Sequence, residues 1–184
     1  KSKEIRFFTI SRLEAVKQLD WAIQAVAKNA HFFPRERFKV YICGAGSDKD
    51  RLKKISNKET LNAPNFSVEF TGYVPSIFYY LKKCDFYLLP SKTEGFPLSL
   101  TESALSGIDC IVTDSSPSIR ELSCIFSNIK ICEQLSLYGF TKEVKKALIK
   151  FLEIGPQKNK KIFNFSSIEE NTNTLIRKMI RTDN

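Results

Sequence analysis

The sequence contains very little histidine and no paired cysteines. His31 is the only histidine among 184 residues, and its place beside two phenylalanines suits a cation at a helix C-terminus. The five cysteines include no Cys-x-x-Cys pair, and most lie in or beside apolar runs, so we expect buried free thiols in a reducing compartment. Neither a zinc site nor a His-based catalytic triad can be assembled from these residues alone.

Long apolar runs are also missing. No run approaches the roughly 20 apolar residues that a bilayer span requires. Because Lys1 leads straight into a strand pattern, we expect no signal peptide and a cytoplasmic protein. With 42% hydrophobic and 27% charged residues, the 184-residue chain has the composition of a soluble globular protein with a substantial core.

The net charge of +9 comes from an excess of basic over acidic residues, and much of this excess lies late in the chain. No aromatic-interleaved basic motif accompanies the excess, so we expect no nucleic-acid partner. Two interpretations stay open: a solvated helix face, or a basic flank that favours an anionic substrate or the inner face of an anionic membrane. The late basic residues are Lys142, Lys145, Lys146, Lys150, Lys158, Lys160 and Lys161.

Apolar runs alternate with segments of helical period over most of the chain. This pattern predicts an α/β fold: a doubly wound, mostly parallel sheet of about six strands with helices on both faces, Rossmann-like in form. The expected strands are 5–10, 38–43, 66–71, 86–89, 110–113 and 129–132. The expected helices include one beginning near Leu19 and others at 48–58, 76–82 and 97–105, with a stripe from Val144 to Leu152.

The end of the chain has a different organisation. We expect a domain over 1–154, followed over 155–184 by a linker at Gly155-Pro156 and a C-terminal helix. Ser166 and Glu169 have the spacing of a capping box at the start of that helix. Its apolar stripe comprises Ile168, Thr172, Leu175, Ile176 and Met179.

Several polar residues and glycines come directly after predicted strands. In an open parallel sheet the ligand crevice lies at the carboxyl ends of the strands, so these residues are expected to share one rim. They are Arg12, Gly44, Gly46, Gly72, Glu94 and Gly95. Gly44-Ala45-Gly46 lacks the third glycine of a dinucleotide fingerprint, and Asp48-Lys49-Asp50 is better explained by acidic residues opening a helix than by a metal site.

Two carboxylates flank the turn between the fourth strand and the next helix. Glu94 precedes Gly95-Phe96-Pro97, and Glu102 lies in the second turn, where its side chain slants back toward Glu94. Gly95 allows backbone to approach a ligand, and Pro97 suits the first helical position. The pair is therefore placed to accept hydrogen bonds from sugar hydroxyls.

The order of these motifs resembles retaining glycosyltransferases with the GT-B fold, most closely family 4, over residues 5 to about 125. Glu94, seven residues and Glu102 stand between Leu-Leu-Pro-Ser and Ser-Ala-Leu-Ser-Gly, as in the donor-site motif of that family. Three earlier segments are similar to its two phosphate turns and its base-binding loop: Ile10-Ser11-Arg12-Leu13 with Lys17, Cys43-Gly44-Ala45-Gly46, and Phe70-Thr71-Gly72-Tyr73-Val74.

The resemblance implies specific roles. Arg12 and Lys17 would hold the donor diphosphate, Glu94 would lie by the donor sugar, and Glu102 would bind the ribose. The remaining substrate-binding residues would be Gly44, Gly46, Tyr73, Val74, Gly95, Phe96, Pro97 and Leu98. Two departures stand out: Gln18 replaces the glycine that usually follows the lysine, which leaves the backbone shape of that turn open, and Ser115-Ser116-Pro117 replaces small residues after the fifth strand.

The resemblance further implies the nucleotide-sugar-binding, carboxyl-terminal half of a glycosyltransferase of hexosyltransferase type. The donor would carry uridine or guanosine diphosphate, without a metal or cofactor, and the acceptor, a glycan or lipid-linked sugar, would bind a missing N-terminal domain. The full-length protein would act in cell-surface polysaccharide or glycoconjugate synthesis, while this fragment alone would be inactive. Gln18 leaves open a non-catalytic nucleotide-sugar-binding module. Arg12 stands where a flavodoxin-like receiver or flavin module would have acidic or flavin-loop residues, which disfavours that third class.

Overall fold

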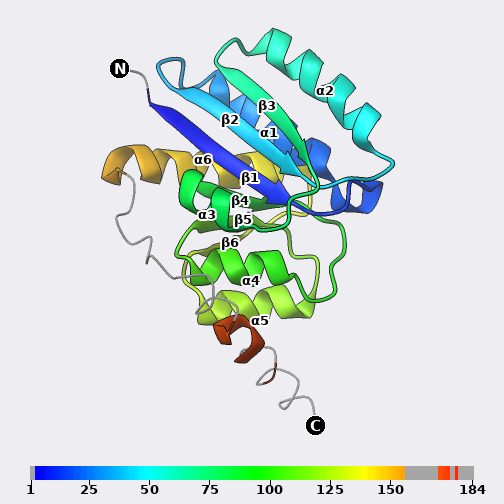
Figure 1. The fold of residues 1–184 in the computed structure, drawn as a ribbon. Coiled ribbons are helices and arrows are strands. Elements are labelled where there is room, and N and C mark those ends of the chain that lie inside the picture. The colour runs from blue at the N-terminus through cyan, green and yellow to red at the C-terminus, as the bar shows by residue number, and fades with distance from the viewer. Residues whose placement is uncertain (1–2, 156–169, 175–176, 178–184) are drawn as a thin grey trace.

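The computed structural model describes residues 3–155, 170–174 and 177. A single sheet of six parallel strands forms its centre, in the order β3-β2-β1-β4-β5-β6 (Figure 1). The order reverses between β1 and β4, which is where an open α/β sheet forms its ligand crevice. The strands are β1 (Glu4–Ile10), β2 (Arg37–Cys43), β3 (Phe66–Gly72), β4 (Phe86–Leu89), β5 (Asp109–Val112) and β6 (Ile129–Ile131).

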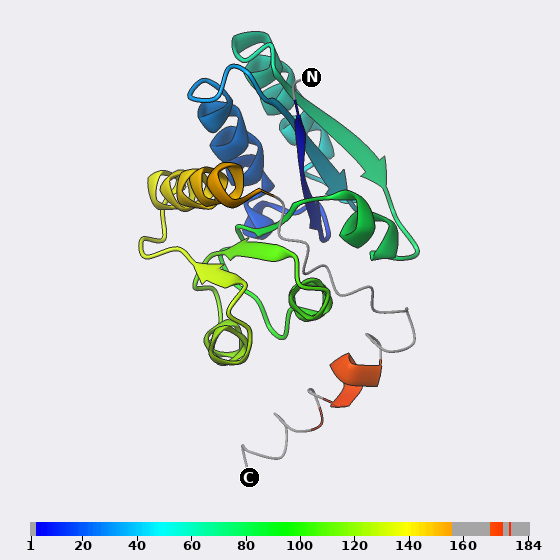
Figure 2. The same cartoon turned by 90° about the vertical axis from the view of Figure 1, so that its left-hand side faces the viewer.

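Helices cover the two faces of the sheet as separate layers (Figures 1 and 2). One hydrophobic cluster packs α1 (Leu19–Ala30), α2 (Lys49–Asn62) and α6 (Leu137–Ile154) against one face. A second cluster packs α3 (Phe78–Lys83), α4 (Leu98–Leu105) and α5 (Pro117–Ile125) against the other. A single 3-10 turn, η1 (Ala15–Lys17), follows β1. Strands buried on both faces are continuous apolar runs, as in β4, whose four residues are all buried.

The fold confirms the predicted α/β class and each predicted strand to within one residue. The helices needed more correction. α4 begins at Leu98 and Pro97 is its N-cap, because the Pro97 ψ of 89° lies outside the helical region. α2 continues to Asn62, beyond the expected end near 58. α5 was not predicted, although Pro117 at its start and the buried pair Ile119 and Leu122 are helix signals.

The remaining expectations divide between confirmed and untested ones. Four cysteines are buried and free, whereas Cys124 is exposed. None of the described helices has the length and hydropathy needed to cross a bilayer. Residues 170–174 are helical, but the linker beyond Gly155 and the capping box at Ser166 lie outside the described residues.

Candidate functional site

The loops at the carboxyl ends of β1, β2 and β3 are joined by backbone hydrogen bonds. Ser11 N donates to Cys43 O at 3.1 Å, and Leu13 N donates to Ala45 O at 2.9 Å. Gly44 N in turn donates to Gly72 O at 2.7 Å. The predicted shared rim is therefore present on this side of the sheet.

Gly44 and Gly46 allow this close packing of loops. Gly44 has a φ of 137°, and a Cβ on it would overlap the backbone oxygen of Ser11. Gly46 has a φ of 159°, and a Cβ there would overlap the backbone oxygen of Leu13. Both positions therefore require glycine for a structural reason, whatever contacts they make with a ligand.

The loop after β4 is held between η1 and the loop after β5. Lys92 N donates to Val16 O at 2.8 Å, and Glu94 N donates to Ser115 O at 3.1 Å. The buried Thr113 hydroxyl donates to Ser91 O at 2.5 Å. These bonds bring together residues that follow three different strands and fix the backbone from Ser91 to Glu94.

An ion pair between Lys17 and Glu94 occupies the centre of this arrangement. Lys17 Nζ lies 2.9 Å from Glu94 Oε1, and the two side chains are only 15% and 11% exposed. The Ser91 hydroxyl donates to the same carboxylate oxygen at 2.5 Å. The sequence placed Lys17 and Glu94 in one site, but it did not predict that they would contact each other or that Ser91 would join them.

Gln18 resolves the question that the sequence left open at the first turn. Its φ of 47° and ψ of 39° are left-handed, and it is the only non-glycine with positive φ among the described residues. The turn therefore keeps the backbone shape that glycine favours, at a strain of about 1–3 kcal/mol. Two buried side-chain oxygens, Gln18 Oε1 and Ser115 Oγ, lack a hydrogen-bond partner within the described part of the chain.

Glu94 and Glu102 act electrostatically on one buried phenol, that of Tyr87 in β4. The Tyr87 hydroxyl forms a 2.7 Å hydrogen bond with Ser99 in α4. Burial raises the pKa of Tyr87 strongly, and the negative charges of Glu94 and Glu102 raise it further. Both carboxylates therefore lie within electrostatic range of the Tyr87 hydroxyl at the junction of β4 and α4.

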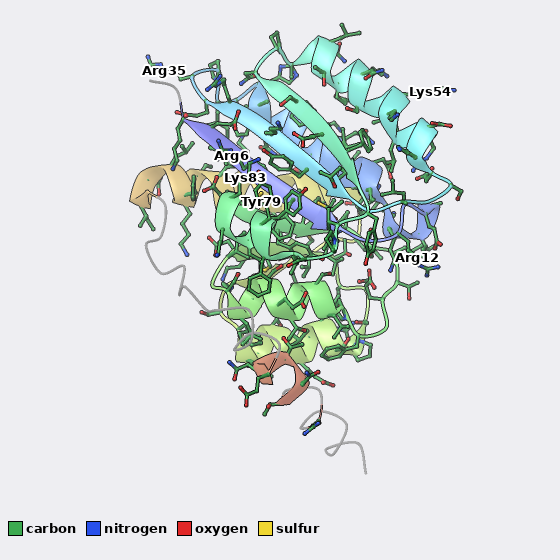
Figure 3. The ribbon with its side chains drawn as sticks, viewed as in Figure 1. Arg6, Arg12, Arg35, Lys54, Tyr79 and Lys83 are labelled. Carbon is green, nitrogen blue, oxygen red and sulfur yellow. The ribbon has the colours of Figure 1, made fainter. Side chains whose placement is uncertain are left out.

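The other predicted cation, Arg12, is on the rim but points toward solvent. Its side chain is 74% exposed and forms a 2.8 Å ion pair with Glu14. Figure 3 shows Arg12 on the side of the molecule toward which the β1 arrow points. The structure therefore brings Arg12 to the same edge of the sheet as Lys17 without placing it in the buried ion pair.

The remaining residues that were predicted to bind the substrate differ in their exposure to solvent. Tyr73 is 81% exposed, and Val74 is half-buried against the second core cluster. Leu98 is 51% exposed, Phe96 is half-buried and Pro97 is buried. Gly95 is exposed with open space where a Cβ would stand, and its carbonyl accepts a 2.7 Å hydrogen bond from Ser118 in α5.

The acidic residues at the start of α2 belong to the opening of that helix. Asp48 is the N-cap of α2 and accepts two hydrogen bonds from Arg51, each 2.7 Å long. Asp50 lies in the first turn, so the predicted role of these residues in opening a helix is confirmed. Within residues 3–155, 170–174 and 177, no group of three His, Cys, Asp or Glu side chains could hold a metal ion.

Some residues of the site were missed by sequence reasoning. Ser91, Thr113 and Ser118 each donate a hydrogen bond to the loop that carries Glu94. Only Ser91 had a local signal, because it stands three residues before Glu94. Thr113 and Ser118 reach the loop from β5 and α5 through the fold.

Residues 1–162 match the family described as Glycosyl transferases group 1. An uncharacterized glycosyltransferase of Haemophilus influenzae is 25% identical over 73% of this chain, a region that covers 36% of that protein. The GtfA subunit of a UDP-N-acetylglucosamine–peptide N-acetylglucosaminyltransferase from Streptococcus parasanguinis is 33% identical over 72% of this chain and 25% of its own length. The chain thus spans well under half the length of these relatives.

The fold also matches a solved structure. The crystal structure of the C-terminal domain of a glycosyl transferase group 1 family protein, LpcC from Francisella tularensis, has a TM-score of 0.60 at 18% identity. The similarity covers 81% of this chain and 75% of that domain. Together with the sequence match over 1–162, it shows that the chain belongs to the glycosyl transferases group 1 family and has the fold of a GT-B carboxyl-terminal domain.

Proposed function

We propose that the chain is the nucleotide-sugar-binding half of a retaining glycosyltransferase of the family 4 type. The observation that carries this proposal is the largely buried cluster of Lys17, Glu94 and Ser91 at the carboxyl ends of the strands. A cation and a carboxylate in contact there match the two parts of a sugar diphosphate, because the phosphates need positive charge and the sugar hydroxyls need acceptors.

Each rim residue then has a role along one extended ligand. Lys17, supported by Arg12, binds the diphosphate, Glu94 faces the donor sugar, and Glu102 accepts hydrogen bonds from the ribose. Tyr73 and Val74 contact the base, and the two glycines of the β2 turn keep backbone close to the phosphates. Gly95, Phe96, Pro97 and Leu98 complete the donor site through backbone contacts. Exposure of Tyr73, Gly95 and Leu98 leaves them accessible to such a ligand.

The chemistry follows from where charge develops. As the sugar leaves, the diphosphate gains negative charge, and a cation fixed beside it lowers the barrier. Lys17 is held in place before the ligand arrives, so it can act in this way without a metal or another cofactor. The donor is expected to be a uridine or guanosine diphosphate hexose, and the UDP-N-acetylglucosamine in the name of the streptococcal relative favours the uridine form.

Transfer needs an acceptor, which we place outside this chain. We propose an N-terminal acceptor domain elsewhere in the protein, a donor domain over 1–154, and a connecting segment and helix over 155–184. This chain alone then binds a donor without transferring the sugar. The complete protein would act in the cytoplasm on a glycan or lipid-linked sugar in cell-surface polysaccharide or glycoconjugate synthesis.

The outward face of α6 supports a membrane-associated location. Tyr138, Lys142 and Ile149 fall on one side of the helix by their spacing, and Tyr138 and Ile149 are 73% and 41% exposed. Exposed lysines beside exposed apolar side chains suit an anionic lipid surface. Binding to phosphatidylglycerol vesicles that disappears at high salt, and that is absent with neutral vesicles, is the expected result. Salt-independent binding, or none, would contradict this part.

The activity itself is tested on the full-length protein with a panel of nucleotide sugars and lipid-linked or glycan acceptors. We expect transfer with retention of the anomeric configuration, read by NMR of the product. Transfer with inversion of the anomeric configuration would contradict the proposal that the protein is of the family 4 type. Donor binding without transfer to any acceptor would favour the rival function, a non-catalytic nucleotide-sugar-binding module.

A further inference from the structure

Lys17, the largely buried cation that would bind a diphosphate in this site, already forms an ion pair with Glu94. Lys17 Nζ lies 2.9 Å from Glu94 Oε1, and both side chains are largely withdrawn from solvent. Low exposure matters because it reduces screening, so the pair is stronger here than an exposed pair would be. A diphosphate must therefore draw Lys17 away from Glu94, or share it, while approaching a negative charge.

A nucleotide sugar and a free nucleoside diphosphate differ in the hydrogen-bond donors that they offer to Glu94. A nucleotide sugar carries hydroxyl groups that can donate hydrogen bonds to the carboxylate when Lys17 turns to the phosphates. A free nucleoside diphosphate carries no such group near Glu94. Its binding leaves the carboxylate without its cation and next to additional negative charge, which is unfavourable in a partly buried site.

We propose that the Lys17–Glu94 ion pair makes the site prefer nucleotide sugars over free nucleoside diphosphates. This inference rests on the proposed function and deepens it, since it assigns Glu94 a role in discriminating substrate from product. Lys17 changes partner from carboxylate to diphosphate, and the sugar hydroxyls offset the loss at Glu94. After transfer the sugar hydroxyls no longer bind Glu94. Lys17 then pairs with Glu94 again, and the nucleoside diphosphate is released more readily.

Ser91 is the positioning residue in this exchange. Its hydroxyl donates to Glu94 Oε1 at 2.5 Å, and its own backbone is anchored by Thr113. The backbone of Glu94 is anchored separately through Ser115 O. These contacts keep the carboxylate in place when Lys17 leaves it, so that it is ready for a sugar hydroxyl.

The test compares affinities for the sugar-free and sugar-bearing ligands by calorimetry. UDP and GDP are titrated against UDP-N-acetylglucosamine and GDP-mannose. Glu94→Gln frees Lys17 and removes the repulsion, so we expect the nucleoside diphosphate to bind about tenfold more tightly, the size of one charge-assisted hydrogen bond. The nucleotide sugar is not expected to gain, so its preference over the diphosphate falls about tenfold or more.

Three further variants make the result specific. Glu4→Gln removes the same charge beside Arg6 at the opposite end of β1, with a 2.7 Å pair, and should leave both affinities unchanged. In the Lys17→Met background only the repulsion is removed, so Glu94→Gln should give a clearly smaller gain for the diphosphate than it gives with Lys17 present. Ser91→Ala keeps both charges and should reduce the preference for nucleotide sugars over nucleoside diphosphates several-fold. It replaces Glu94→Gln as the test if thermal unfolding shows that Glu94→Gln disturbs folding.

Each outcome decides between the proposals. Equal or weaker diphosphate binding by folded Glu94→Gln, or a gain of the same size in the Lys17→Met background, overturns the partner exchange while leaving the donor site intact. A preference unchanged by Ser91→Ala when Glu94→Gln does not fold overturns it as well. If the wild-type chain binds none of the four ligands, the proposed function itself fails, and this inference fails with it.

Discussion

Replacing Gly44 with alanine tests whether the rim is built by close packing of backbone, as the structure indicates. Gly44 has a φ of 137°, a region that residues with a side chain avoid. The new Cβ would overlap the backbone oxygen of Ser11, which cannot move aside as a flexible side chain could. The loop after β2 must therefore shift away from the loop after β1.

The magnitude follows from the parts that are disturbed. The unfavourable φ accounts for about 1–3 kcal/mol. The shift also strains the hydrogen bonds from Ser11 N to Cys43 O and from Gly44 N to Gly72 O, 3.1 and 2.7 Å long, each worth about 0.5–1.5 kcal/mol. We expect Gly44→Ala to lower the free energy of unfolding by about 2–6 kcal/mol in total. That is a large part of the roughly 5–15 kcal/mol typical of a whole domain.

Urea denaturation followed by circular dichroism measures this difference. Gly95→Ala is the matched control, because a Cβ at Gly95 meets no atom within 4 Å. Its unfolding free energy should stay within about 0.5 kcal/mol of the wild-type value. A Gly44→Ala variant as stable as Gly95→Ala would refute the packing argument for the rim.

Two other predictions concern stability. Gln18→Gly should raise the free energy of unfolding by about 1 kcal/mol, because the φ of 47° is strained for glutamine and relaxed for glycine. A destabilised variant in the same urea assay would mean that the Gln18 side chain contributes more than its backbone strain removes. Burial raises the pKa of Asp109 above its usual 3.8, despite the opposing charge of Lys150. Its ionisation therefore removes stability as the pH rises through that raised pKa, so Asp109→Asn should gain melting temperature over wild type at pH 7 and lose that gain near pH 3.5, below the usual pKa. An advantage for the variant that is equal at both pH values would contradict this explanation.

The strands could be predicted because their signal is local. β4 and β5 are short apolar runs that are almost entirely buried, and such a run is visible without knowledge of its neighbours. The turn residues at the rim were predictable for a related reason, since every parallel strand delivers its following residue to the same edge. The unpredicted α5 shows the limit, because Ser115-Ser116-Pro117 has the composition of a loop and the helix after it is short.

The interior of the site could not be predicted, because its contacts join residues that are far apart in the sequence. Lys17 and Glu94 are 77 residues apart in the sequence and meet only because β1 and β4 are neighbours in the sheet. The left-handed backbone of Gln18 runs against the preference of its residue type and is imposed by the turn between η1 and α1. Arg12 was predicted as an equal partner of Lys17, and its exposure and its pair with Glu14 came only from the structure.

The central claim is that one rim of the sheet binds a nucleotide sugar along Lys17 and Glu102. Calorimetric titration with UDP-N-acetylglucosamine and GDP-mannose tests it most directly, in the wild-type chain and in Lys17→Met, Glu102→Ala and Glu4→Gln. We expect one donor to bind the wild-type and Glu4→Gln proteins equally, and about tenfold or more weakly to Lys17→Met and Glu102→Ala. Absence of binding, or binding that neither rim substitution weakens, would contradict the account.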